Sequence, residues 1–291
     1  MKVLILGADG MIGHKMAQKF YKPGFELYLN TRSKKDFLKE IFPKAITIQN
    51  NFLVSDILKI LNKISPDYIL NCCGITIRRG INLNRSNSIK INSELPYLIS
   101  DWTRNKSSKL IQFSTDCVFT GKKGFYNDYS TPDAKDLYGL TKAKSEIGIK
   151  NTLTLRSSMI GREIFNKTEL LEWLISNKNK VINGFSNVIY SGITTIEMSK
   201  YVYDIIDKNI SISGIYNVSS KPISKFDLLK KLNKKFNLNI KIINDNSFSS
   251  DKTLNSQAFF AKTGLKTPSW DLMLEELFLD SIKFNDIYKK I

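Results

Sequence analysis

The chain has 291 residues, 42% of them hydrophobic, and a formal net charge of +17. This composition can bury a large core in one or two domains, and no run approaches the ~18 consecutive apolar residues of a membrane-spanning helix. The charge raises nucleic-acid binding as a hypothesis, but only 7 of the 44 basic residues are arginines and the lysines are scattered. We therefore expect no nucleic-acid surface and no membrane partner, only a field that steers anionic small molecules.

Histidine and cysteine are too scarce for metal or disulfide chemistry. The chain has three cysteines, Cys72, Cys73 and Cys117, and one histidine, His14. Three cysteines make no disulfide framework, and no CxxC or other zinc spacing occurs. The apolar run in MKVLILGADG is too short for a signal-peptide core, and a buried strand explains it better. We expect a cytoplasmic protein without a metal site.

The first 160 residues alternate short apolar runs with longer amphipathic segments such as 11–21 and 54–64. Continuous apolar strands separated by helices predict a parallel sheet covered on both faces, because right-handed crossovers place the helices there. The expected strands are 2–7, 25–30, 45–50, 67–74, 109–115 and 153–158. The predicted architecture is a doubly wound (Rossmann) α/β fold.

After about residue 160 this regular pattern loosens. The expected elements are helices near 168–177, 196–208 and 224–236, and short strands at 214–220 and 239–244. Polar connections separate them. We predict a Rossmann domain over 1–160 and a smaller substrate-binding lobe over 161–291, with part of 181–220 returning to the sheet.

A glycine-rich turn follows the first strand. The segment GADGMIG places Gly7, Gly10 and Gly13 in a GxxGxxG pattern, with a helix expected from Met11. Glycines permit a tight turn and a close backbone approach, so that a helix N-terminus can present N–H groups to a pyrophosphate. We predict dinucleotide contacts from these glycines and from Met11 and Ile12. The alternative is a strand-to-helix turn in which the glycines serve only packing.

The end of the second strand bears on which dinucleotide is bound. NAD-specific proteins usually place an acidic residue there to hold the ribose 2′-hydroxyl, whereas this chain reads LYLNTRSKK. Arg32, with lysines after it, offers a cationic pocket for a 2′-phosphate. The sequence therefore predicts NADP(H), with NAD(H) as the less favoured cofactor. A solvated basic turn is the alternative interpretation.

Tyr138 and Lys142 stand four positions apart in DLYGLTK, so on one helix their side chains share a face. A nearby ammonium lowers a phenol pKa from its usual ~10, which lets a tyrosine exchange protons with a carbonyl or alcohol oxygen. Upstream, KLIQFSTDCVF ends a strand on Ser114 and Thr115, at the edge where open α/β sheets bind ligands. The alternative for the Tyr–Lys pair alone is a surface helix pair.

Four motifs in this order resemble the extended short-chain dehydrogenase/reductase family, and more narrowly its dTDP-4-dehydrorhamnose reductase-like branch. They are GADGMIG, NCCG, STDCVFTGKKGFYNDYSTPDAKDLYGLTK and LRSSMIG. Weaker echoes occur at GIYNVSS and TGLKTPSWDLMLEEL. The resemblance implies an NADPH-dependent reductase of the C4 carbonyl of a nucleotide-linked 4-keto-6-deoxy sugar, serving deoxysugar supply for surface polysaccharide.

The resemblance also implies roles for single residues. Thr115 would orient the substrate carbonyl and Tyr138 would supply the proton. Lys142 would lower the pKa of Tyr138 and grip the nicotinamide ribose. The predicted cofactor contacts are Gly7, Gly10, Met11, Ile12, Gly13, Arg32, Cys73, Gly74, Ser114, Tyr138 and Lys142.

The predicted substrate contacts are Thr76, Arg78, Asn92, Thr115, Cys117 and Thr194. Arg78, in GITIRRG, offers a bidentate contact to a diphosphate or is a solvated loop charge. Asn92 supports the active site or lies on a helix surface or cap. Thr194 closes over the sugar or caps the helix that follows it.

Cys117 separates this chain from neighbouring activities. The reductase branch commonly reads STDYVF, so a side chain that lines the sugar has changed here. Sugar-nucleotide dehydratases carry Thr-Asp-Glu, and the lack of that glutamate argues against dehydration. An NAD(P)-dependent epimerase remains an alternative, as does a non-catalytic NADP-binding regulatory subunit, although the intact Thr115, Tyr138 and Lys142 weigh against the latter. By family analogy, a homodimer would form through the helices flanking the Tyr–Lys pair.

Overall fold

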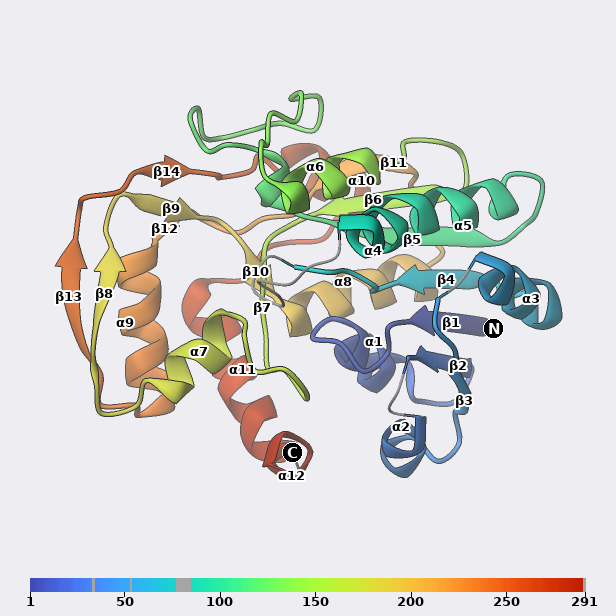
Figure 1. The fold of residues 1–291 in the computed structure, drawn as a ribbon, viewed down its shortest axis with the longest axis horizontal. Helices are drawn as coiled ribbons and strands as arrows, with labels where there is room; N and C mark the ends of the chain where they lie inside the picture. The colour runs from blue at the N-terminus through green and yellow to red at the C-terminus, as the bar shows by residue number, and fades with distance from the viewer. Residues whose placement is uncertain (33–34, 53, 77–84, 290–291) are drawn as a thin grey trace.

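A computed structural model of the chain shows a seven-stranded sheet with helices on both faces (Figure 1). It describes residues 1–32, 35–52, 54–76 and 85–289. The strands are β1 (Lys2–Leu6), β2 (Glu26–Thr31), β3 (Ile46–Gln49), β4 (Tyr68–Asn71), β5 (Lys109–Ser114), β6 (Thr152–Arg156) and β11 (Gly214–Asn217). All pair in parallel, in the order β11-β6-β5-β4-β1-β2-β3. The predicted doubly wound α/β fold is confirmed.

Helices and short turns connect these strands. In this part of the chain they are α1 (Gly13–Phe20), α2 (Lys35–Ile41), α3 (Val54–Ile64), α4 (Arg85–Ile89), the π-helical turn η2 (Lys90–Glu94), α5 (Leu95–Thr103), the 3-10 turn η3 (Asp116–Val118) and α6 (Leu137–Lys144). The expected start of the first helix at Met11 is wrong by two residues. Gly10 N donates to Gly7 O at 3.0 Å, and Met11 and Ile12 complete this turn before α1 begins.

Alternate residues of β1 enter two different cores. Val3 and Ile5 join a cluster that includes apolar residues of α1. Leu4 and Leu6 join a second cluster with residues of α3 and α5. Because successive side chains of a strand point to opposite faces, a strand that is apolar at every position must be covered on both sides. The continuous run KVLIL therefore accounts for the two helical layers.

The second half of the chain adds a smaller layered unit beside the main sheet (Figure 1). Outside the main sheet, this half contains β7 (Met159–Ile160), α7 (Leu170–Ser176), β8 (Val181–Phe185), β9 (Val188–Tyr190), β10 (Ile193–Thr194), α8 (Thr195–Asp207), β12 (Ile223–Ser224), α9 (Lys225–Phe236), β13 (Lys241–Asp245), β14 (Ser250–Asp251), α10 (Gln257–Thr263), α11 (Trp270–Lys283) and α12 (Asn285–Lys289). Of these, α8 packs on α1 and α10 packs on β11 of the main sheet. β8 pairs with β13 and α9 packs on both, while β12, β9 and β14 form another small sheet. Between these pieces, β11 crosses back and pairs with β6.

None of the helices formed by the described residues is long and apolar enough to cross a bilayer.

Candidate active site

Most of the predicted site residues that the structure describes meet at the carboxyl ends of the central strands. Gly7 follows β1, Cys72 and Cys73 follow β4, and Thr115 follows β5. β1 and β4 are neighbours at the point where the strand order reverses, because β2 and β3 lie on one side and β4 onward on the other. Open α/β sheets bind ligands in the crevice at such a switch point.

The glycine turn leaves the start of α1 open. Gly7 has a φ of +72°, and a Cβ on Gly13 would lie 2.0 Å from the Gly7 carbonyl oxygen, so both positions require glycine. This contact is internal to the turn, and packing alone accounts for Gly13. The N-terminus of α1, however, has no side-chain cap, which leaves its first N–H groups without a side-chain partner. A pyrophosphate that accepts hydrogen bonds from these groups fits the turn.

The end of β2 lies against the glycine turn. Ala8 N donates to Asn30 O at 2.9 Å, and Thr31 Oγ1 donates to Asp9 Oδ2 at 2.8 Å. Arg32 is exposed directly after the strand. The predicted cation is therefore accessible at this edge, together with the Asp9 carboxylate, which the sequence analysis did not consider.

Cys73 lies between the glycine turn and Lys142. A Cβ on Gly7 would stand 3.2 Å from the Cys73 Sγ. Burial raises the pKa of Cys73, the Asp9 carboxylate adds to this effect, and the positive charges of Lys142 and Arg32 oppose it. The thiol is thus close to both ends of the predicted dinucleotide site.

Helix α6 carries the Tyr–Lys pair. The Asp136 side chain caps its start by accepting a hydrogen bond from Gly139 N at 2.9 Å. A Cβ on Gly139 would lie 2.4 Å from the Cys117 carbonyl oxygen, so glycine allows α6 to pack against the turn after β5. This packing brings the helix that holds Tyr138 and Lys142 onto the carboxyl edge of the sheet.

Lys142 is buried against the sheet, with 4% of its surface exposed. Its Nζ donates to the Phe113 carbonyl oxygen at 2.5 Å. Burial lowers the pKa of Lys142 to about 8, and the negative charge of Glu146 partly opposes this shift. The ammonium therefore sits beside the ends of β4 and β5, as a contact to the nicotinamide ribose requires.

Tyr138 lies beside Thr115 and Cys117. Burial raises its pKa, and a hydrogen bond with the Thr115 side chain opposes this rise. The expectation that Lys142 lowers this pKa is wrong for the folded chain, because Nζ of Lys142 is turned to the Phe113 carbonyl and desolvation dominates. The phenol keeps its proton at neutral pH, which is the state that a proton donor needs.

Thr115 and Ser114 have different surroundings although they are neighbours. Thr115 Oγ1 accepts from Cys117 N at 3.1 Å and lies close enough to Asp116 Oδ1 to donate at 3.3 Å. Ser114 Oγ instead donates to Glu146 Oε1 at 2.7 Å. The Ser114 hydroxyl is thus bonded to the buried Glu146 carboxylate. Only the backbone of Ser114 remains for the predicted cofactor contact.

Asn92 is fully buried in the π-helical turn η2. Its Oδ1 accepts from Ile75 N at 2.9 Å, and its Nδ2 donates to Ile75 O at 3.0 Å and Thr141 Oγ1 at 3.1 Å. Gly74 lies next to it, with room for a Cβ 3.9 Å from the Asn92 side-chain oxygen. Asn92 thus ties the segment after β4 to α6, and it is neither a surface residue nor a cap. π-helical turns of this kind are frequent at functional sites.

The other predicted substrate contacts lie in different surroundings or outside the described residues. Thr76 Oγ1 donates to Glu169 Oε1 at 2.9 Å. Thr194 is buried and caps α8 by accepting from Glu197 N at 3.2 Å, which is the capping alternative. Arg78 lies outside the described residues.

Three residues beside the Tyr–Lys pair escaped the sequence analysis. Asp116 is buried, which raises its pKa, and the positive charges of Lys225 and Lys252 oppose the shift. The negative charge of Glu169 raises the pKa of both Tyr138 and the buried Tyr190. Asp116 belongs to the quoted STDC motif and was open to detection, whereas Glu169 and Tyr190 come from segments without a motif.

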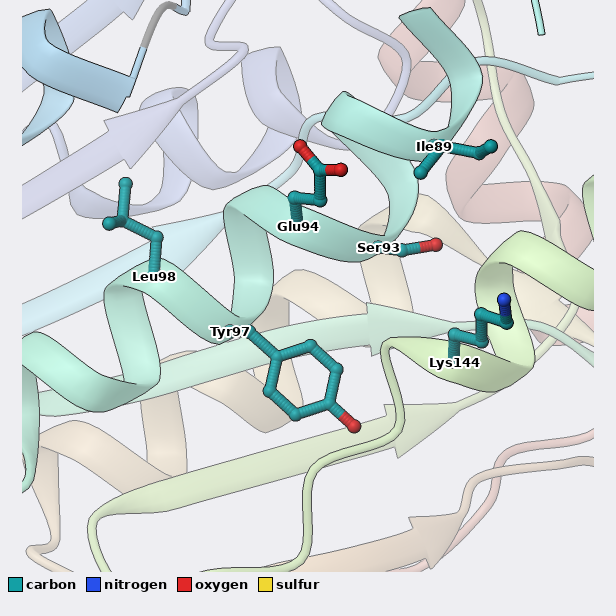
Figure 2. Close-up of a pocket in the computed structure, with 6 residues that line it drawn as sticks. All are labelled: Ile89, Ser93, Glu94, Tyr97, Leu98 and Lys144. Atoms are coloured by element: carbon teal, nitrogen blue, oxygen red, sulfur yellow. The ribbon is translucent and has the colours of Figure 1, made fainter. Parts of the chain in front are cut away.

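An open depression of about 580 Å³ lies away from these residues, between α4, η2, α5 and α6 (Figure 2). It is lined by Ile89, Ser93, Glu94, Tyr97, Leu98 and Lys144. Lys144 lies on α6, two residues after Lys142, but none of the predicted site residues lines the depression. The described residues also form no group of three His, Cys, Asp or Glu side chains able to hold a metal ion.

A doubly wound sheet with a glycine turn at its switch point and a Tyr–Lys pair beside it defines a dinucleotide-dependent oxidoreductase class. The model of one family, described as the RmlD substrate binding domain, matches residues 1–279. The chain belongs to this family. The predicted dTDP-4-dehydrorhamnose reductase-like branch and NAD(P)-dependent oxidoreductase class are thereby confirmed.

Solved structures show the same fold at low sequence identity. A dTDP-4-dehydrorhamnose reductase from Bacillus anthracis str. Ames, in complex with NADP, is 21% identical with a TM-score of 0.79, covering 96% of this chain and 99% of its own. The reductase from Yersinia enterocolitica is 20% identical with a TM-score of 0.74, covering 95% and 98%. A UDP-glucose 4-epimerase from Thermotoga maritima, with UDP-glucose, is 13% identical with a TM-score of 0.81, covering 98% and 100%. No curated protein sequence matches the chain.

Proposed function

We propose that the chain is an NADPH-dependent reductase of the C4 carbonyl of a nucleotide-linked 4-keto-6-deoxy sugar. One observation carries the proposal: Thr115, Tyr138 and Lys142 meet at the carboxyl edge of the sheet, next to an uncapped glycine turn. The site formed by Thr115, Tyr138 and Lys142 provides proton transfer, and the glycine turn provides phosphate binding. We place the pathway role in deoxysugar supply for surface polysaccharide.

The residues divide the reaction between them. The reduced nicotinamide would supply a hydride to the carbonyl carbon. Tyr138 gives its proton to the carbonyl oxygen, so that the ketone becomes an alcohol, and the raised pKa ensures that this proton is present. Thr115 orients the same oxygen through its hydroxyl. Solvent then restores the phenol proton, and Lys142 is assigned to the nicotinamide ribose.

The dinucleotide is held from both sides of the switch point. Gly7, Gly10 and the N-terminus of α1 bind the pyrophosphate, and Lys142 binds the nicotinamide ribose. Arg32 favours the 2′-phosphate of NADP(H), with NAD(H) as the weaker ligand. The Bacillus anthracis reductase, which is similar in fold, contains NADP.

The sugar nucleotide occupies the side of Tyr138 that faces away from the glycine turn. Thr76 and Cys117 are proposed to bound this side, while the buried Asn92 holds the segment after β4 in place. Burial keeps the Cys117 thiol neutral by raising its pKa to about 12. A neutral thiol there replaces a bulkier aromatic side chain. We therefore assign residues 1–160, with part of 181–220, to dinucleotide binding and 161–291 to the sugar nucleotide.

The assembly and location follow from other features. Tyr97 on α5, 48% exposed, lines the depression of Figure 2, and Leu140 on α6 is 46% exposed. We propose that two copies pair through this face, which light scattering would detect as twice the chain mass, with Tyr97→Glu reducing it to one. The three free thiols favour the reducing cytoplasm. No nucleic-acid partner is proposed.

The experiment that tests the activity mixes the protein with NADPH and a keto sugar nucleotide and follows the loss of dihydronicotinamide absorbance. A reductase consumes one NADPH per sugar, because the hydride stays in the product. An epimerase regenerates its cofactor and shows no net loss. A regulatory subunit binds NADPH without turnover. Either of these last two results would overturn the proposal.

A further inference from the structure

The carboxylate that the end of β2 lacks is supplied by the glycine turn. β2 ends on Asn30 and Thr31 and is followed by Arg32, so no acidic residue stands at the strand end. Thr31 Oγ1 instead donates to Asp9 Oδ2 at 2.8 Å, and Ala8 N donates to Asn30 O at 2.9 Å. These two bonds hold the third residue of the turn against the strand end.

The Asp9 carboxylate is fixed with one oxygen available. Thr31 is fully buried, so its hydroxyl has no competing water and engages Oδ2 alone. A carboxylate has about four lone-pair sites, and Oδ1 is therefore able to accept from a hydroxyl of a ligand. Asp9 itself is only half-buried, which leaves that oxygen accessible.

Asp9 and Arg32 act on the same small region with opposite charge. The charges of both act on the buried Cys73 thiol, whose Sγ would lie 3.2 Å from a Cβ on Gly7. A carboxylate accepts hydrogen bonds from ribose hydroxyls and repels a phosphate, whereas a guanidinium attracts the phosphate. The adenosine ribose of a dinucleotide would meet both groups at once.

We propose that Asp9 is a cofactor-specificity residue that receives the adenosine ribose hydroxyl and opposes Arg32, so that this chain binds NADH as well as NADPH. This inference rests on the proposed function of the same site. It names the group that would hold NADH despite Arg32, because the acidic residue comes from the turn. Thr31 is a positioning residue that aims the carboxylate.

The test measures dissociation constants of NADH and NADPH by dihydronicotinamide fluorescence, without any sugar substrate. Asp9→Asn should weaken NADH binding by about tenfold and strengthen NADPH binding by a few-fold, since a charged hydrogen bond and a repulsion are both removed. Arg32→Ala should weaken NADPH about tenfold and leave NADH within about twofold. Thr31→Val, which keeps the shape of the side chain, should shift the ratio as Asp9→Asn does but less.

The outcomes separate the two proposals. If the unchanged protein binds neither dinucleotide, the proposed function and this inference both fail. If it binds them but Asp9→Asn leaves the NADH-to-NADPH ratio unaltered, only the role of Asp9 is overturned. Thermal melting of each variant shows whether it is folded, and Thr31→Val provides the answer if Asp9→Asn unfolds.

Discussion

The dinucleotide side and the substrate side of the active site are built in different ways. On the dinucleotide side, buried parallel strands and the turns that follow them position Gly7 and the Tyr–Lys helix. Strands and helices alternate regularly along this part of the chain. On the substrate side, short strands and loops between 159 and 194 bring in single side chains such as Glu169 and Tyr190. The regular side holds the residues proposed for dinucleotide binding and proton transfer, and the irregular side supplies side chains that no sequence motif predicts.

Two buried polar junctions hold the molecule together, one within the main sheet and one between α1 and α12. Arg156 on β6 bonds Glu146 with two nitrogens, at 2.7 and 2.6 Å, and Asn217 of β11 at 2.9 Å. Arg156 is thus a buried structural partner within the sheet. In the second junction, the Nε2 atom of His14 on α1 lies 3.1 Å from the hydroxyl oxygen of Tyr288 on α12. Changes at the chemical centre and at these junctions therefore test different parts of the comparison.

The largest effect is expected at the chemical centre. Tyr138→Phe should lower turnover by roughly 10²–10⁴-fold, because a positioned proton donor contributes about that much. NADPH affinity should stay within about twofold, since no dinucleotide phosphate contacts this phenol. Steady-state kinetics and a fluorescence titration measure the two quantities. Retained turnover would show that Tyr138, at the sheet edge, is not the proton donor.

The next effect concerns the junction at β6. Arg156→Met should lower the free energy of unfolding by about 3–5 kcal/mol, because it leaves the buried Glu146 carboxylate without its cation. Both side chains of the pair are at most 4% exposed. Urea denaturation measures the change. The double variant with Glu146→Gln should recover part of the loss, and a single variant with unchanged stability would show that the main sheet does not depend on this ion pair.

Lys142 sets a pH limit on dinucleotide binding. Its pKa in the folded chain is about 8, lowered by burial, so the ammonium is present below pH 8 and is lost above it. NADPH affinity should fall about tenfold between pH 7 and pH 9, following the protonated fraction. Lys142→Arg keeps its charge over this range and should give a flat profile. A flat profile for the unchanged protein would mean that this ammonium does not contact the dinucleotide.

The smallest effect is expected at the junction of α1 with α12. Burial lowers the pKa of His14 well below 6.5, and the charges of Lys15 and Arg162 add to this. Above pH 6.5 the imidazole is neutral in both the folded and the unfolded chain. Below it the unfolded chain binds a proton that the folded chain refuses, so stability falls by up to about 1.4 kcal/mol per pH unit.

His14→Gln should remove that part of the acid sensitivity while it keeps a polar side chain beside Gly10, whose carbonyl oxygen lies 2.8 Å from the imidazole Nδ1. Thermal melting between pH 5.5 and 7 compares the two chains. Equal slopes for both would show that His14 is not the titrating group.

The periodic part of the molecule was predictable because its signals are local. KVLIL alone predicts a strand covered on both faces, and the glycine spacing predicts the turn after it. The Asp9–Thr31 contact joins positions 22 residues apart, and the Thr76–Glu169 contact joins positions 93 residues apart. Neither contact can be predicted from a local sequence pattern. The pKa of Tyr138 was predicted in the wrong direction, because sequence spacing fixes which residues share a helix face but not where a lysine Nζ points.

The central claim is that Tyr138 delivers a proton while a hydride passes to the C4 carbon of a sugar ketone. The most direct measurement uses NADPH that carries deuterium at the transferred position and analyses the sugar product by mass spectrometry and NMR. We predict one deuterium, on C4, for each NADPH oxidised, and incorporation that is roughly 10²–10⁴-fold slower with Tyr138→Phe. A sugar that changes configuration without gaining deuterium, or no change of the sugar at all, would contradict it.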